Sequence, residues 1–190
     1  MKKIAIFASG GGSNAESIIN YFKGHSSIDV SLIVSNKEKA FVLKRAKKHN
    51  IPSVYISNKD FKSGELVLEK LIEHDIEYII LAGFLLLIPR TLTQKFPNRI
   101  LNIHPALLPN YGGKGMYGQH VHQAVFNNFE KESGMTIHLV NEKYDEGKIL
   151  FQVKVDLKVT DTPDVIAAKV LKLEHKHYPE VINDYLKSQS

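Results

Sequence analysis

Two side chains suited to carbonyl chemistry lie close together at the end of an apolar run. Asn102 and His104 are separated by one residue, and Pro105 follows them. Positions i and i+2 of a strand share a face, so an amide donor and a titratable imidazole would lie side by side. Such a pair suits a reaction in which negative charge develops on a carbonyl oxygen. The alternative is structural, because an Asn and a His at a strand end could simply cap the next turn.

A carboxylate from a distant turn could complete this pair. Tyr144-Asp145-Glu146-Gly147 lies between two late apolar stretches, where Asp and Gly are also ordinary turn residues. If this turn meets the Asn102–His104 strand end, Asp145 would orient or charge the imidazole and raise the pKa of His104. Residue spacing alone does not decide between this role and a purely structural turn.

A glycine-rich turn near the N-terminus indicates an anion site. Gly10-Gly11-Gly12-Ser13-Asn14 follows the first apolar run and precedes a helical stretch. Glycines allow close backbone approach, and a helix N-terminus offers unpaired N–H groups with a partial positive charge. We expect this turn to bind a phosphate or another anion, in preference to serving only as a tight turn capped by Ser13 or Asn14.

The same turn also satisfies the dinucleotide pattern G-x-G-x-x-A, which is weak on its own. A dinucleotide site would need an acidic residue at the end of the second strand to hold a ribose hydroxyl. That strand ends in Ser35-Asn36-Lys37 instead. NAD is therefore disfavoured, and an NADP-type site is left open.

The elements that must position these residues indicate an α/β fold. Apolar runs at 3–9, 30–35, 53–56, 77–83 and 99–103 alternate with helical stretches at 14–22, 40–49 and 65–74. This alternation predicts a Rossmann-like, mostly parallel sheet with helices on both faces. Residues 135–140 and 149–157 alternate in polarity and predict an antiparallel strand pair in the C-terminal part. Helices are expected at 163–175 and 178–187, within a single domain covering residues 1–190.

Composition limits the classes of function. The chain has no cysteine, which excludes a disulfide scaffold, a thiolate zinc site and a cysteine nucleophile. The net charge of +5 comes from dispersed lysines, so small anionic substrates are favoured over nucleic acid. No apolar run is long enough for a membrane span, and we expect a cytoplasmic protein with no membrane partner.

The histidines outside the Asn102–His104 pair predict no catalytic metal. His120 and His122, like His175 and His177, are spaced i, i+2, and such residues face apart on a helix. Solvated or structural roles are expected for them. His138 is expected to be a satisfied core histidine, although a place along the cleft is left open.

Together these motifs resemble the folate-dependent formyltransferases, over essentially the whole chain. The resemblance is carried by the glycine turn, by Leu81-Ala82-Gly83-Phe84, by the run from Leu101 to Pro109 and by Tyr144-Asp145-Glu146-Gly147, in that order. Ser13-Asn14 favours the branch that acts on a ribonucleotide. The resemblance implies direct transfer of the formyl group of 10-formyltetrahydrofolate to the amine of 5-phosphoribosylglycinamide in purine biosynthesis.

The resemblance also implies roles for individual residues. Asn102 and a protonated His104 would stabilise the oxyanion, and Asp145 would support His104 and take the amine proton through water. The substrate phosphate would lie on Gly11, Gly12, Ser13 and Asn14, and its ribose hydroxyls on Glu174. The folate would contact Leu85, Leu86, Ile88, Val140, Asn141 and Asp145.

Several positions depart from the family pattern. Residues 110–118 are unusually glycine-rich and predict a mobile flap, and the family's arginines near Gly64 and at Leu86 are absent. We hypothesise that Lys114 supplies the missing positive charge at the phosphate. Leu171 stands where a polar ribose contact is common, and Leu108-Pro109 is a candidate cis peptide.

Other assignments account for less of the sequence. A methionyl-tRNA formyltransferase would need a tRNA-binding domain, a formyltetrahydrofolate deformylase normally carries a regulatory domain, and nucleotide-sugar formyltransferases are generally longer. An NADP-binding oxidoreductase or a non-catalytic binding module leaves Asn102, His104 and Asp145 without a role. Small-molecule substrates are expected as partners, and the sequence leaves a homodimer open.

Overall fold

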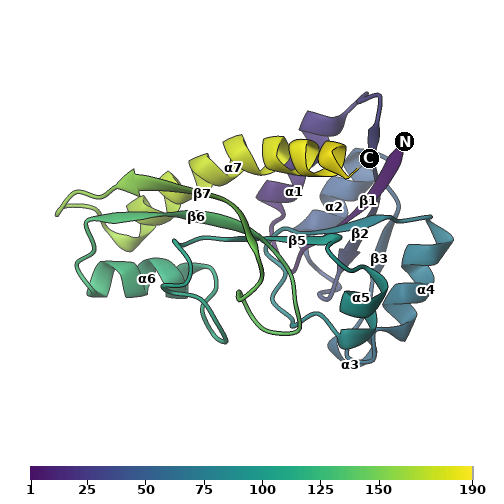
Figure 1. Ribbon diagram of the computed structural model, residues 1–190, viewed down its shortest axis with the longest axis horizontal. Coiled ribbons are helices and arrows are strands. Elements are labelled where there is room, and N and C mark those ends of the chain that lie inside the picture. The colour runs from purple at the N-terminus through teal and green to yellow at the C-terminus, as the bar shows by residue number, and fades with distance from the viewer. Residues whose placement is uncertain (190) are drawn as a thin grey trace.

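The computed structural model describes residues 1–189 and contains one mixed sheet of seven strands in the order β3-β2-β1-β4-β5-β6-β7 (Figure 1). Neighbouring strands from β3 to β5 are parallel, whereas β6 is antiparallel to both β5 and β7. This topology confirms the predicted fold. The strands are β1 (Lys2–Phe7), β2 (Ile28–Ser35), β3 (Ser53–Tyr55), β4 (Tyr78–Leu81), β5 (Ile100–His104), β6 (Glu132–Leu139) and β7 (Ile149–Asp156).

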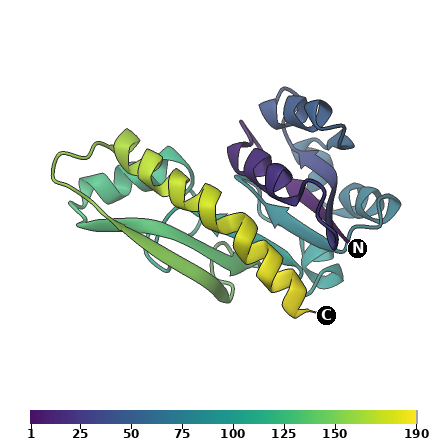
Figure 2. The ribbon, with the colours of Figure 1, turned by 90° about the horizontal axis from the view of Figure 1, so that it is seen from above.

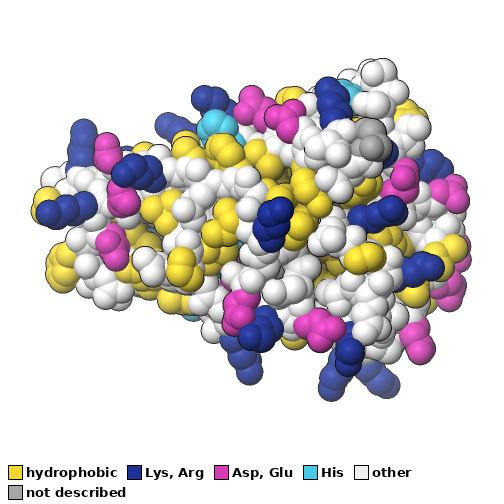
Figure 3. Space-filling model, viewed as in Figure 1, with side chains coloured by type: hydrophobic (Ala, Val, Ile, Leu, Met, Phe, Trp, Pro, Cys, Tyr) yellow, Lys and Arg dark blue, Asp and Glu magenta, His cyan; other side chains and the backbone are white. Residues whose placement is uncertain are grey.

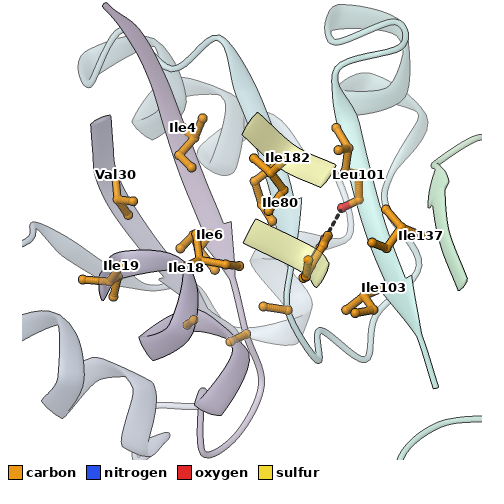
Figure 4. Close-up of a cluster of buried hydrophobic side chains, with 14 of the residues drawn as sticks. Ile4, Ile6, Ile18, Ile19, Val30, Ile80, Leu101, Ile103, Ile137 and Ile182 are labelled. Atoms are coloured by element: carbon orange, nitrogen blue, oxygen red, sulfur yellow. Dashed lines mark hydrogen bonds between the residues drawn. The ribbon is translucent and has the colours of Figure 1, made fainter. Parts of the chain in front are cut away.

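Two hydrophobic cores lie on opposite faces of the sheet, because alternate residues of the central strands point opposite ways. In β1, Ile4 and Ile6 pack in one core, seen in Figure 4, while Ala5 and Phe7 pack in the other. The first core is covered by α1 (Ser13–Phe22), α2 (Phe41–Lys48), α6 (Gln119–Asn127) and α7 (Pro163–Ser188). The second is covered by α3 (Asn58–Phe61), α4 (Glu65–Glu73) and α5 (Arg90–Lys95).

The strand order reverses direction between β1 and β4, and this point positions the site. The chain moves outward from β1 through β2 to β3, then returns to β4 on the other side of β1. Ligands of open α/β sheets bind outside the carboxyl ends of the strands at such a switch point. Here the backbone N–H of Ser9 donates to the carbonyl of Gly83 at 3.0 Å, which joins the segments leaving β1 and β4.

The C-terminal helix differs from the sequence prediction. Two helices were expected, but α7 is one helix of 26 residues with Pro179 inside it, and it crosses the sheet to end beside β1 (Figures 1 and 2). Proline has no N–H for the carbonyl four residues earlier, here that of His175. The hydroxyl of Ser17 on α1 donates to this carbonyl at 2.9 Å, so the helix continues without an unsatisfied group.

Other local predictions were incomplete. The short helices α3 and α5, and α6 after the glycine-rich segment, were not predicted, and β2 begins at Ile28 rather than at residue 30. The expected cis peptide Leu108-Pro109 is present. Basic and acidic side chains are interspersed on the face drawn in Figure 3, as the dispersed lysines indicate. Within residues 1–189, no helix is both long and apolar enough to cross a membrane.

Candidate functional site

Four polar side chains meet where β5 and β6 pair. Asn102 is directly opposite His138 in the antiparallel ladder, and the amide Nδ2 of Asn102 lies 3.1 Å from Nε2 of His138. Asp145, from the turn between β6 and β7, lies with Oδ1 3.4 Å from Nδ2 of Asn102 and Oδ2 3.5 Å from Nδ1 of His104. The structure therefore brings together the three residues that the sequence predicted, and adds His138.

His138 fixes the orientation of the Asn102 amide. Its Nδ1 lies 2.9 Å from the carbonyl oxygen of Leu139, which can only accept, so Nδ1 carries the proton. In the neutral ring Nε2 is then an acceptor for the amide N–H of Asn102. Nε2 also lies 3.5 Å from Oδ1 of Asp145. The sequence signal was available, because cross-strand register pairs the two positions, but register cannot be read from spacing alone.

The turn carrying Asp145 is held close to β6 by steric constraints. A side chain at Gly147 would place its Cβ 1.6 Å from the carbonyl oxygen of Leu139, so only glycine fits there. The backbone N–H of Gly113 donates to Oδ2 of Asp145 at 2.9 Å, and Asp145 itself has a positive φ of 56°. The glycine-rich segment and this turn thus position the carboxylate together.

Burial and the Asp145 carboxylate have opposite effects on the charge state of His104. The ring is 4 % exposed, and this burial lowers the pKa of His104, despite the opposing effect of Asp145. Its Nε2 donates to the carbonyl of Tyr111 at 2.7 Å. A neutral ring then has an unprotonated Nδ1 facing the Asp145 carboxylate. Desolvation therefore outweighs the carboxylate in the free protein.

Asp145 is charged in the same surroundings. Burial alone would raise the pKa of Asp145, but the adjacent imidazoles of His138 and His104 and the N–H of Gly113 together lower that pKa below its usual value. An ionised carboxylate thus faces the neutral His104 imidazole across a distance that one proton could bridge.

An apolar cavity of about 370 Å³ opens on one side of Asn102. Four of the predicted folate contacts line it together with Asp145, namely Leu85, Leu86, Ile88 and Val140. Asn141 is outside this lining, and its exposed side chain accepts a hydrogen bond from the N–H of Lys143 at 2.9 Å. An apolar pocket with a few polar groups at one end is typical of a site for a small organic ligand.

A second cavity of about 410 Å³, the glycine-turn cavity, opens on the other side of Asn102. All five residues from Gly10 to Asn14 line it, and Glu174 of α7 faces them. The two cavities share four lining residues, which are Phe84, Leu85, Asn102 and Tyr117. Asn102 is thus the site side chain at which ligands in the two cavities would meet, whereas His104 lines neither.

Helix α2 orients the peptides of the glycine turn. The N–H of Val42 donates to the carbonyl of Gly10 at 3.1 Å, and Nε of Arg45 donates to the carbonyl of Gly11 at 2.8 Å. In a planar trans peptide the following N–H points away from the carbonyl. The N–H groups of Gly11 and Gly12 therefore point away from α2. Gly12, at φ +70°, has no room for a side chain, because its Cβ would lie 2.6 Å from Val42 Cγ2.

Glu174 is a buried carboxyl group with one partner. The amide of Asn14 donates to its Oε2 at 2.6 Å, and only 7 % of the residue is exposed. Burial raises the pKa of Glu174 to about 6, with the Asn14 hydrogen bond acting in the opposite direction. The carboxylate therefore has unused acceptor capacity inside the glycine-turn cavity.

The structure does not bring Lys114 to the glycine turn. Lys114 lines the apolar cavity, because the N–H of neighbouring Gly113 ties the segment to Asp145. Gly64 caps α4 and packs against Pro89 and Thr91, outside both cavities. Leu171 does line the glycine-turn cavity.

His122 was expected to have a solvated or hydrogen-bonded structural role, but the structure places it in the wall of the glycine-turn cavity. It is 6 % exposed, lines the glycine-turn cavity and has a buried Nδ1 without a hydrogen-bond partner among the described residues. The i, i+2 spacing correctly indicated that His120 and His122 lie on different faces of α6, and His120 is exposed. The spacing did not reveal which of the two histidines faces inward. Across residues 1–189 no group of three or more His, Cys, Asp or Glu side chains could hold a metal ion.

The sequence profile described as formyl transferase matches residues 2–182 of this chain. The chain belongs to the formyl transferase family. This family member is 44 % identical to the chloroplastic phosphoribosylglycinamide formyltransferase of Arabidopsis thaliana, and the match covers 95 % of the chain but 64 % of that relative's length. It is 38 % identical to phosphoribosylglycinamide formyltransferase of Bacillus subtilis, with 98 % of the chain and 95 % of the relative covered.

Solved structures lead to the same family. The formyl transferase fold described above superposes on the crystal structure of phosphoribosylglycinamide formyltransferase from Bacillus halodurans with a TM-score of 0.90. The two proteins are 36 % identical, and the superposition covers all of this chain and 97 % of the other.

Proposed function

We propose that this chain transfers the formyl group of 10-formyltetrahydrofolate to the amine of 5-phosphoribosylglycinamide, a step of purine biosynthesis. The observation that carries this proposal is the meeting of two cavities at Asn102, beside the Asp145 carboxylate. One cavity suits an aromatic ligand and the other a phosphorylated one, so a group could pass between them at Asn102. Relatives named phosphoribosylglycinamide formyltransferase match almost the entire chain.

Each substrate has a cavity of matching chemistry. The pterin would lie in the apolar cavity among Leu85, Leu86, Ile88 and Val140, with its formyl-bearing nitrogen toward Asn102. The phosphate of the ribonucleotide would accept hydrogen bonds from the N–H groups of the turn from Gly11 to Asn14, at the start of α1. The Glu174 carboxylate would then accept hydrogen bonds from the ribose hydroxyls.

The reaction would proceed by direct attack of the amine on the formyl carbon. A carbon–nitrogen bond forms, and the carbonyl electron pair becomes an oxyanion that the amide N–H of Asn102 stabilises. The new ammonium loses a proton, through water, to Asp145. The unprotonated Nδ1 of His104, 3.5 Å from Oδ2 of Asp145, can share that proton. Collapse of the oxyanion then breaks the bond to the folate nitrogen, which takes up the proton as it leaves.

The proton balance gives His104 a function even though it lines neither cavity. Two acceptor atoms that face each other across 3.5 Å leave a gap that suits one added proton. Once protonated, the His104 imidazolium adds positive charge near the oxyanion. His104 would thus be neutral in the free enzyme and charged during the reaction.

The direct test is the absorbance change as 10-formyl-5,8-dideazafolate loses its formyl group, with and without the ribonucleotide. Turnover that requires the ribonucleotide, and that falls at least about a hundredfold in His104→Ala, is the expected result. Turnover without ribonucleotide would instead mean hydrolysis of the formyl donor. The cytoplasmic location remains a prediction, and a homodimer remains open.

A further inference from the structure

The glycine-turn cavity contains a buried histidine for which the reaction above gives no role. His122, on α6, is 6 % exposed and lines this cavity with Asn102, Pro105 and Gly118. Its Nδ1 is fully buried and has no hydrogen-bond partner within the described chain. A buried polar atom without a partner costs free energy, and native structures keep few of them. His122 therefore keeps hydrogen-bonding capacity that no described residue uses, in the wall of the glycine-turn cavity.

The position of His122 relates it to the middle of the substrate. The phosphate end of the cavity is the turn at Gly10–Asn14, and Glu174 marks the ribose position. The reacting amine must reach Asn102 at the other end. Between the ribose and that amine the ribonucleotide has one amide group. His122, on α6, lines the cavity together with Asn102 and with Pro105, which directly follows β5, so it belongs to the wall near the reacting end.

The protonation state of His122 suits an amide. Burial is the main cause that lowers the pKa of His122, and the neighbouring His104 lowers it further, so the ring is neutral near pH 7. A neutral imidazole has one N–H donor and one acceptor nitrogen. An amide likewise offers one acceptor oxygen and one N–H donor. A carboxylate or phosphate would favour a protonated ring instead.

We propose that His122 is a specificity-determining residue that hydrogen-bonds the amide linking the ribose to the glycine of the ribonucleotide. This proposal rests on the proposed function. It explains why a polar ring occupies a buried position on α6 between the apolar residues Val121 and Val125. It also predicts discrimination between the ribonucleotide and ribose phosphates that lack the amide.

The test compares Michaelis constants in His122→Leu, His122→Asn and His120→Leu. His120 is the matched control, since it lies on the same helix but is exposed against the ring of Tyr117. His122→Leu should raise the KM for the ribonucleotide about tenfold or more and change the KM for the formyl donor less than about twofold. His122→Asn retains polar atoms near the Nδ1 position and should recover part of the loss. His120→Leu should match the wild type.

A truncated ligand separates this contact from a structural role. Ribose 5-phosphate keeps the phosphate and ribose but lacks the amide, so its inhibition constant should be equal in wild type and His122→Leu. Equal weakening of both ligands, with a lowered unfolding temperature and no recovery in His122→Asn, would make His122 structural and overturn the proposal. An unchanged ribonucleotide KM in His122→Leu would overturn it as well. Wild-type enzyme that does not use the ribonucleotide at all would refute the proposed function, and this inference with it.

Discussion

Asp145 lies between two imidazoles, and its charge determines where a proton can reside in the site. Oδ1 is 3.5 Å from Nε2 of His138 and Oδ2 is 3.5 Å from Nδ1 of His104. His138 is committed to the carbonyl of Leu139 through Nδ1, so its free nitrogen is an acceptor for Asn102. His104 is the imidazole that can accept a proton beside the carboxylate.

Replacing Asp145 with Asn removes the carboxylate that we propose takes the proton of the amine, while the size and shape of the side chain are kept. We expect kcat to fall by about two to four orders of magnitude, with Michaelis constants changed far less, because a general base acts in the transition state. Steady-state kinetics would measure both. Glu146→Gln is the control, since Glu146 is an exposed neighbour paired with Lys143 at 3.0 Å. A similar loss in both variants would contradict the role of Asp145.

We expect the Glu174 carboxylate to lower the free energy of unfolding and to strengthen binding of the ribonucleotide. Burial raises its pKa from 4.5 to about 6, so the folded protein disfavours the charged form. The resulting cost is absent below the unfolded pKa, grows as the pH rises toward about 6 and is then constant, at about 2 kcal/mol. Glu174→Gln should therefore raise the free energy of unfolding at pH 8 by up to this amount, with little effect at pH 4. Denaturant unfolding at both pH values measures it.

The same substitution should weaken ribonucleotide binding at pH 8, because a carboxylate accepts hydrogen bonds from two hydroxyls better than an amide does. In the wild type this binding should also weaken as the pH falls through about 6. A variant that is less stable at pH 8, or that binds the ribonucleotide as well as the wild type does, would contradict this account of Glu174.

At the scale of elements, α2 fixes the orientation of the peptides in the glycine turn. Arg45 donates to the carbonyl of Gly11 through Nε, and its Nη1 lies 3.1 Å from Oε2 of Glu16 on α1. Arg45→Ala frees the Gly11–Gly12 peptide to rotate, so we expect the ribonucleotide KM to rise about tenfold and the formyl-donor KM to stay constant. Lys44→Ala is the neighbouring control, because the Nζ of Lys44 lies over the ring of Phe41, 5.7 Å from its centroid. Equal KM values in wild type and Arg45→Ala would refute this positioning role.

The continuity of α7 should depend on one hydrogen bond from α1. Ser17→Ala leaves the carbonyl of His175 without its partner, and we expect a loss of about 1 kcal/mol in the free energy of unfolding. Pro179→Ala restores an N–H for that carbonyl. In a double-mutant cycle, Ser17→Ala should cost less in the Pro179→Ala background, as measured by denaturant unfolding. Additive effects would show that Ser17 does not compensate for the proline.

Part of the fold and of the candidate site could be predicted from the sequence alone. The strands and the order of the motifs were predicted, because apolar runs and glycine turns are local features. The continuity of α7 through Pro179 was not predicted, because the hydroxyl that donates to the carbonyl of His175 belongs to Ser17, 158 residues away in the chain. The contact of His138 with Asn102 and the inward position of His122 also escaped prediction. The first depends on strand register, and the second on which face of α6 meets the cavity.

For the whole molecule, the arrangement of the two cavities explains the placement of charges. The apolar cavity receives Lys114 and Lys143, whereas the glycine-turn cavity is lined by backbone N–H groups and Glu174, without a lysine or arginine. The hypothesis that Lys114 supplies positive charge at the phosphate depended on which cavity the loop 110–118 lines, and the sequence alone did not define this. Binding of each ligand to its own cavity should stabilise the folded protein by mass action.

The measurement closest to the central claim is mass spectrometry of the ribonucleotide after incubation with the formyl donor and the enzyme. We expect a singly formylated ribonucleotide with wild-type protein, formed at least about a hundredfold more slowly by Asn102→Ala, which lacks the proposed oxyanion donor. Unmodified ribonucleotide with wild-type enzyme, or equal rates in the two proteins, would contradict formyl transfer at Asn102.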